Sequence, residues 1–107
     1  MPIANIDAAS KFSLEKMQKN SLFASEQLFC DVYCLEPGQE QRVHAHDGSD
    51  KIYYVLEGSG VFTLGEDSSE QSAGDVVHAP AGIDHGVRND SSARLRCLVV
   101  MAPPPQH

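Results

Sequence analysis

Residues 74–89 read GDVVHAPAGIDHGVRN. A short β-branched run in this segment ends at Pro80 and Gly82, and His85 follows three residues after the glycine. Proline and glycine at the end of such a run predict a tight turn. We therefore expect one strand over 75–79 and another over 85–88, with the turn between them presenting His85 at the start of the second strand.

A second histidine group lies earlier in the chain, where His44 and His46 are separated by one alanine. Alternate side chains of a strand point to the same face, so both imidazoles are expected to enter one space. A strand offers two metal ligands in this way. A His-x-His sequence also arises by chance, so the pair needs independent support.

The spacing around both groups supplies that support. Gly38, the pair His44 and His46, and Gly58 resemble the first sequence motif of the cupin superfamily. The segment 74–89 resembles the second motif at each of its fixed positions, which here are Gly74, Pro80, Gly82, His85 and Asn89. At ordinary residue frequencies, five such positions coincide by accident in on the order of one chain in 10⁵. The resemblance runs from about Leu22 to Met101.

The resemblance implies an all-β fold, the double-stranded β-helix or jelly-roll cupin barrel. It also implies one divalent transition metal held by His44, His46 and His85. Three neutral imidazoles suit Zn²⁺, Fe²⁺, Ni²⁺, Mn²⁺ or Cu²⁺, and ligand type alone does not choose among them. Three protein ligands would leave coordination positions open to water or substrate. A pocket without metal is the alternative interpretation.

One position departs from the family pattern. Family members commonly have a glutamate as a fourth ligand, and that position here is Lys51, with Asp50 one residue early. A divalent ion and an ammonium about 5 Å apart repel by roughly 6 to 7 kcal/mol at an effective dielectric near 20. Our first hypothesis is that Lys51 turns away to Asp50 or Asp47; alternatively it is neutral, or it shares an anionic ligand, a carboxylate or enolate, with the metal.

Two further residues are candidates for the pocket lining. Tyr53 and Val55 share the face of Lys51 if that strand alternates regularly. Tyr53 is equally compatible with a place in the core. His78 could add a polar group to the pocket, or it could be a satisfied core or surface histidine. No catalytic residue is assigned.

Glycine and other turn residues divide the chain into short segments rich in Val, Ile, Tyr and Phe. This pattern is typical of an all-β domain. A helix over 14–19, capped by Ser13, is expected in an N-terminal arm over 1–20. The barrel is expected over 21–102 and an extended tail over 103–107. The expected strands cover 22–35, 41–46, 51–57, 61–64, 71–72, 75–79, 85–88 and 93–101.

Composition and net charge limit the classes of partner that this protein can bind. The net charge is −7 and the basic residues are scattered, which argues against binding to nucleic acid or an anionic membrane. The sequence contains no run of about 18 apolar residues, so we expect a cytoplasmic protein that binds a small molecule. Segments 28–35 and 95–101 are apolar on both faces, which predicts a second covering layer and makes a homodimer plausible.

Cys30, Cys34 and Cys97 cannot all pair within one chain, and none forms a Cys-x-x-Cys arrangement. We interpret them as reduced core thiols; the alternative is a metal or redox pair formed by Cys30 and Cys34. His107, after three prolines, is not expected to be a ligand.

The family resemblance does not select an activity, because one fold hosts many functions. The first function hypothesis is metal-assisted transformation of a small, anionic metabolite. The second is a metal- or ligand-binding, sensing module without catalysis. A storage role is a third, disfavoured by the complete histidine set.

Overall fold

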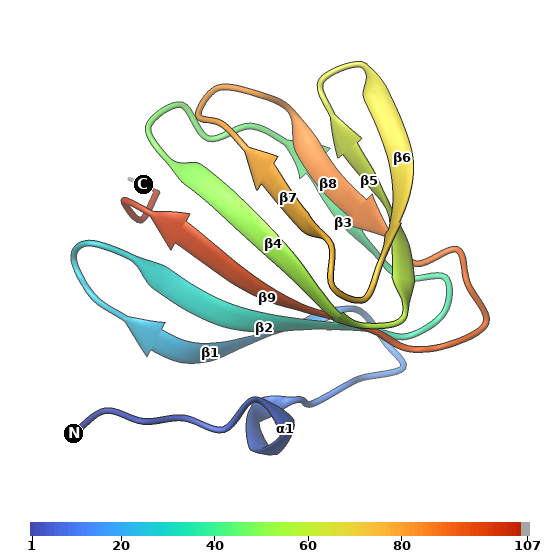
Figure 1. The fold of residues 1–107 in the computed structure, drawn as a ribbon, viewed down its shortest axis with the longest axis horizontal. Coiled ribbons are helices and arrows are strands. Elements are labelled where there is room, and N and C mark those ends of the chain that lie inside the picture. The colour runs from blue at the N-terminus through green and yellow to red at the C-terminus, as the bar shows by residue number, and fades with distance from the viewer. Residues whose placement is uncertain (106–107) are drawn as a thin grey trace.

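The computed structural model describes residues 1–105, which fold into two facing antiparallel sheets preceded by a short helix (Figure 1). One sheet has the strand order β1-β2-β9-β4-β7 and the other β3-β8-β5-β6. This double-stranded β-helix confirms the expected jelly roll. The elements are α1 (Ile6–Ala9), β1 (Gln18–Ala24), β2 (Phe29–Leu35), β3 (Glu40–His44), β4 (Asp50–Glu57), β5 (Ser59–Leu64), β6 (Asp67–Ser72), β7 (Val76–Ala79), β8 (His85–Arg88) and β9 (Leu95–Ala102).

The core lies between the two sheets and is built by strand alternation. In β4, Lys51, Tyr53 and Val55 all face inward and are at most 1% exposed, as the two-residue period predicts. Strand β9 contributes a matching set from Leu95 to Met101. Phe62 of β5 packs its ring against Tyr53 from the opposite sheet, with the ring centroids 5.2 Å apart.

The expected helix over 14–19 is wrong. The Ser13 hydroxyl accepts from the Glu15 N–H as a cap would, but residues 14–17 form no helix and the chain enters β1 at Gln18. Pairing of β1 with β2 overrides the weak local helix signal, because each paired residue satisfies its backbone groups in the sheet. The observed helix is α1, whose first turn is capped by Asn5 accepting from the Ala8 N–H.

The single strand expected over 22–35 is also wrong, since this stretch holds the end of β1 and all of β2. A turn separates them, in which Ser25 N–H donates to the Leu28 carbonyl and the Ser25 hydroxyl accepts from the N–H groups of Gln27 and Leu28. The strand expected at 71–72 is the end of a longer one, β6. Neither the serine turn nor the polar strand β6 carries a glycine, proline or β-branched signal.

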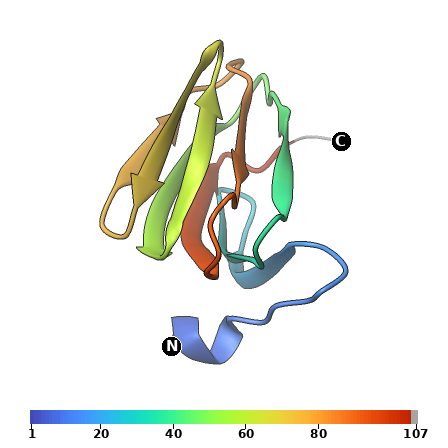
Figure 2. The same ribbon diagram turned by 90° about the vertical axis from the view of Figure 1, so that its right-hand side faces the viewer.

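The N-terminal segment covers part of the outer face of the five-stranded sheet. Val32 and Cys34 are fully buried although they alternate with the core-facing Tyr33. Arg96 of β9 ties the segment down by donating to the Asp7 carboxylate at 2.9 Å and the Ser10 hydroxyl at 3.0 Å. The predicted second layer over 28–35 is thus partly the chain's own arm, with α1 below the strand ends in Figure 2.

Two glycines permit close backbone approaches. Gly58 has φ +81°, and a Cβ there would overlap the Arg94 carbonyl oxygen. Gly86 has an extended backbone, but a Cβ would lie 2.8 Å from the Gln41 carbonyl oxygen. The bare Gly86 therefore lets β8 lie tightly against β3, which places His85 opposite His44 in the ladder.

The three cysteines are free, and Cys34 and Cys97 are buried, as expected for core thiols; Cys30 is half-buried. The tail is anchored where the Ser49 hydroxyl donates to the Pro103 carbonyl. His107 lies outside the described residues. Over 1–105, the one helix is far too short to cross a membrane.

Candidate metal centre

The three predicted histidines come together at one end of the barrel. His44 ends β3, His46 follows in the next loop, and His85 begins β8. Their ring centroids are 4.6 Å apart for His44 and His46, 4.7 Å for His44 and His85, and 5.7 Å for His46 and His85. The Gly82 N–H donates to the His46 carbonyl, so the turn before β8 is fastened to the loop that carries the second histidine.

Backbone carbonyls fix the orientation of two rings. Nδ1 of His44 lies 2.7 Å from the Arg42 carbonyl oxygen, and Nδ1 of His85 lies 3.0 Å from the Ile83 carbonyl oxygen. A carbonyl only accepts, so each Nδ1 carries the proton and donates. Each Nε2 then keeps its lone pair, which is the form of imidazole that binds a metal.

His85 is the most deeply placed of the three. It is 2% exposed, and within residues 1–105 its Nε2 has no hydrogen-bond partner. Burial, reinforced by the charge of Lys51, lowers the pKa of His85 to about 4, against the opposing effect of the Ile83 carbonyl. This imidazole is therefore neutral at physiological pH, with an unsatisfied buried acceptor that a cation would satisfy.

One ligating atom from each histidine lies within 4.8 Å of the others. Three imidazole nitrogens at this spacing form a donor set suited to a divalent transition metal. The fit rests on the chemistry of the donors and on the buried Nε2 of His85.

Lys51 points into the barrel, which contradicts the first hypothesis that it turns away. Its side chain is 1% exposed, and Nζ lies 4.9 Å from the ring centroids of both Tyr33 and Tyr53. Among the described residues Nζ has no hydrogen-bond acceptor. Burial, with a further contribution from the positive charge of Lys19, lowers the pKa of Lys51 to about 7.

The carboxylates expected to receive Lys51 lie elsewhere. Asp50 accepts from the Ala81 N–H at 2.9 Å and lies 3.4 Å from Nε2 of His78, on the exposed side of the strand. Asp47 is exposed in the loop after His46. Strand alternation explains the outcome: Asp50 and Lys51 are adjacent in β4, so they point to opposite faces.

The other two predicted pocket residues are placed outside the histidine cluster. Tyr53 is a core residue beneath the cluster, and its hydroxyl donates to Oε1 of the buried Gln41 at 2.6 Å. His78 faces outward on β7 and borders a separate groove with Val76. Only Lys51 of the four pocket candidates lines the cavity that His44 and His46 border.

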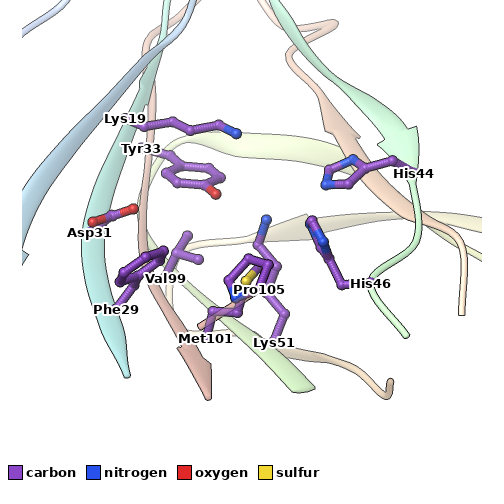
Figure 3. A pocket seen from close by; sticks show the side chains of 10 residues that line it. All are labelled: Lys19, Phe29, Asp31, Tyr33, His44, His46, Lys51, Val99, Met101 and Pro105. Carbon is purple, nitrogen blue, oxygen red and sulfur yellow. The ribbon is translucent and has the colours of Figure 1, made fainter. Parts of the chain in front are cut away.

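That cavity has a volume of about 250 Å³ and reaches from the histidines across to strands β1 and β2 (Figure 3). Sequence reasoning missed its far wall. The available signal was the alternation of Phe29, Asp31 and Tyr33 in β2, which places these three side chains on one face of the strand. The remaining lining residues that were not predicted are Lys19, Val99, Met101 and Pro105.

Charged groups gather on this far wall. In Figure 3 the side chains of Lys19 and Lys51 both end in the space between Tyr33 and the two histidines. Asp31 of β2 lies at the same wall, where burial raises its pKa while the charges of Lys19 and Lys51 oppose the rise. The cavity thus has imidazole donors at one end, the Lys19 amine and the Asp31 carboxyl group at the other, and the Lys51 amine between them.

The model of the cupin domain matches residues 31–101. The chain belongs to the cupin family. This cupin is 46% identical to the TT1209 protein of Thermus thermophilus, whose crystal structure superposes with a TM-score of 0.93 over 96% of this chain and 98% of that one.

Two curated relatives are similar over shorter stretches. MJ1618 of Methanocaldococcus jannaschii, named an uncharacterized protein, is 34% identical over 70 residues, which are 65% of this cupin and 56% of that protein. A Thermotoga maritima protein named oxalate-binding protein is 32% identical over 85 residues, 79% of this cupin and 69% of that protein. The match therefore spans little more than half of the first relative.

Proposed function

We propose that this cupin holds one divalent transition metal through His44, His46 and His85, and that the adjoining cavity binds a small anionic metabolite. The observation that carries the proposal is the buried Nε2 of His85, which lacks a hydrogen-bond partner within residues 1–105 and lies in a cluster whose ligating atoms are within 4.8 Å. A buried acceptor without a partner is costly, and a cation is the group that three lone pairs would stabilise.

The anionic character of the ligand follows from the far wall. Lys51 carries an amine inside the cavity with no carboxylate acceptor among the described residues, and Lys19 brings a second one. An anion between metal and amines would relieve the repulsion between the positive charges. The name of the Thermotoga maritima relative, an oxalate-binding protein, is consistent with a small carboxylate or enolate as ligand.

A bound divalent metal would supply Lewis-acid polarisation of a ligand oxygen. The chain's own residues then have separate tasks. The Arg42 and Ile83 carbonyls hold the His44 and His85 rings in the ligating tautomer. Lys51 and Lys19 orient the anionic end of the ligand, and the apolar side chains Val99 and Met101 limit water in the cavity.

The alternative function is a non-catalytic metal- or ligand-binding, sensing module. The same geometry supports it, because a cavity that retains its ligand needs the same donors as one that transforms it. Turnover of a small carboxylate by the metal-loaded protein distinguishes the two. We also infer a homodimer, supported by the exposed apolar side chains Tyr54 and Val76 on the five-stranded sheet, and a cytoplasmic location stays a prediction.

Elemental analysis tests the metal site. Protein purified without chelators or nickel resin is compared with the His44→Ala, His46→Ala double variant and with His78→Ala, a matched control whose histidine lies outside the cluster. We expect about one metal ion per chain in the wild type and in His78→Ala, and none in the double variant. Equal metal content in all three proteins would remove the site.

A further inference from the structure

Lys51 has the surroundings of a reactive amine rather than of a structural cation. Structural lysines place the ammonium against carboxylates or in water. Nζ of Lys51 is different: the residue is 1% exposed, no acceptor lies within hydrogen-bond distance among the described residues, and the Asp31 carboxylate acts on it only through its charge. Its closest recorded neighbours are the faces of Tyr33 and Tyr53, each with its centroid 4.9 Å away.

Lys51 nevertheless lines the cavity of about 250 Å³, so a ligand in that cavity would lie beside its side chain. Figure 3 shows Nζ at the centre of this space, between the β2 wall and the histidines. A buried amine that borders a ligand-sized cavity is the arrangement in which lysine acts as a nucleophile toward carbonyl carbons. The lowered pKa of Lys51 is consistent with this role.

We propose that Nζ of Lys51 condenses with the carbonyl group of a small 2-oxo acid to form an imine. The nitrogen lone pair attacks the carbonyl carbon and forms the C–N bond. The C–O bond then breaks, and the carbonyl oxygen leaves as water with the two amine hydrogens. Amine and 2-oxo acid therefore give imine and water, with no oxidant or reductant consumed.

The 2-oxo acid class follows from Lys19, which lines the same cavity from β1. Its Nζ lies 5.5 Å from the centroid of the Tyr33 ring whose face also receives Lys51, so the two amines flank one aromatic side chain. A carboxylate adjacent to the carbonyl can pair with Lys19 while the carbonyl carbon reaches Lys51. The cavity volume suits a ligand of a few heavy atoms. The inference rests on the proposed function for the anion-binding character of the cavity, but it requires no metal.

Reductive trapping tests the imine directly. The full-length protein, once with metal and once after chelation, is incubated with glyoxylate and cyanoborohydride, and the modified lysines are located by peptide mass spectrometry. We expect one carboxymethyl group on Lys51, in at least tenfold excess over the exposed Lys11, Lys16 and Lys19. Labelling spread evenly over the lysines, or absent from Lys51, overturns the proposal.

Two variants separate the roles of the amines. Lys51→Arg keeps the positive charge but cannot form an imine, so labelling at this position disappears. Lys19→Met keeps the Lys51 amine, and labelling of Lys51 by glyoxylate should fall severalfold while labelling by propionaldehyde, which lacks a carboxylate, is unchanged. An equal loss with both reagents overturns the role of Lys19.

The same samples distinguish this inference from the proposed function. Retained metal with unlabelled Lys51 contradicts the imine alone. Labelled Lys51 in a protein that binds no metal supports the imine and contradicts the metal site.

Discussion

The histidine cluster beside the cavity and Lys51 within it each present a buried nitrogen without a hydrogen-bond partner in residues 1–105, but the two regions are built in opposite ways. At the histidine end, Nε2 of His85 offers a lone pair, and the Ile83 carbonyl fixes the ring. In the cavity, Nζ of Lys51 offers protons or an amine lone pair, and it lies against the faces of Tyr33 and Tyr53. One end is suited to a cation, the other to an anion or an electrophile.

The departure at Lys51 leaves the three histidines clustered, so under the proposed function it alters which ligand the cavity accepts and leaves the metal donors in place. A carboxylate in this position would add negative charge next to a metal. A lysine instead would leave a bound metal with imidazole ligands alone, and its positive charge acts on His85. Substitutions at the histidine cluster, at Lys51 and at Asp50 test this difference.

The largest effect is expected at the histidine end. His85→Ala removes the proposed ligand whose orientation is fixed by both the β3–β8 ladder and the Ile83 carbonyl. Residues that only hydrogen-bond to a metal ligand already contribute about 10- to 100-fold to metal affinity. Loss of a ligand itself should therefore lower the affinity for metal by at least about 100-fold. Titration with Zn²⁺ by calorimetry measures it. An affinity within threefold of the wild type would exclude His85 as a ligand.

The next effect concerns stability at the lysine end of the chelated protein. The pKa of Lys51 falls from 10.5 to about 7 on folding, so the unfolded chain binds more protons between these values and stability rises with pH. The rise from pH 7 to pH 10 attributable to Lys51 is about 3 kcal/mol.

Lys51→Met should remove this slope and be more stable than the wild type at pH 7. Urea unfolding of both proteins at several pH values gives the free energy of unfolding of each. The tyrosines and cysteines are present in both proteins, so their titration cancels when one free energy is subtracted from the other. Parallel pH profiles would mean that Lys51 is protonated and solvated in the folded protein.

A smaller effect is expected of the charge at position 51 on metal affinity at the histidines. Lys51→Glu replaces repulsion of a bound metal by attraction and should raise metal affinity about tenfold or more, since the full Coulomb difference is an upper bound. Lys51→Gln serves as the neutral control, and its metal affinity should lie between that of the wild type and that of Lys51→Glu. Competition with a chromogenic chelator measures the order. A glutamate variant that binds metal no better than the wild type would show that position 51 does not act on the metal.

The sequence predicted the histidine end much better than the lysine end. His44, His46 and His85 stand in motifs with fixed spacing, and turns at Gly82 and the close approach at Gly86 deliver them together. Lys19 and Asp31 have no motif. They meet the cavity only because a serine turn folds 18–35 into the β1–β2 hairpin, and that turn carries no proline or glycine.

The orientation of Lys51 could have been predicted from the sequence. Alternation in β4 places Lys51 on the face of Tyr53 and Val55, and both of those are apolar enough to be core. The expectation that a charged lysine would seek Asp50 or Asp47 gave more weight to ion pairing than to the strand period. The structure follows the strand period, because turning one residue outward would disrupt the ladder on both sides of β4.

The smallest effect is expected from Asp50, which lies beside Lys51 in sequence and across the sheet from it in space. Its contacts with the Ala81 N–H and with His78 hold its pKa below the usual value, so they stabilise the fold above the unfolded pKa and are lost as the pH falls through the folded one. Because the carboxylate is exposed, this contribution is small. Asp50→Ala should lower the thermal midpoint slightly at pH 7 and less at pH 3, with unchanged metal affinity. A tenfold loss of metal affinity would instead place Asp50 at the metal, and the cavity would then have a carboxylate at its histidine end after all.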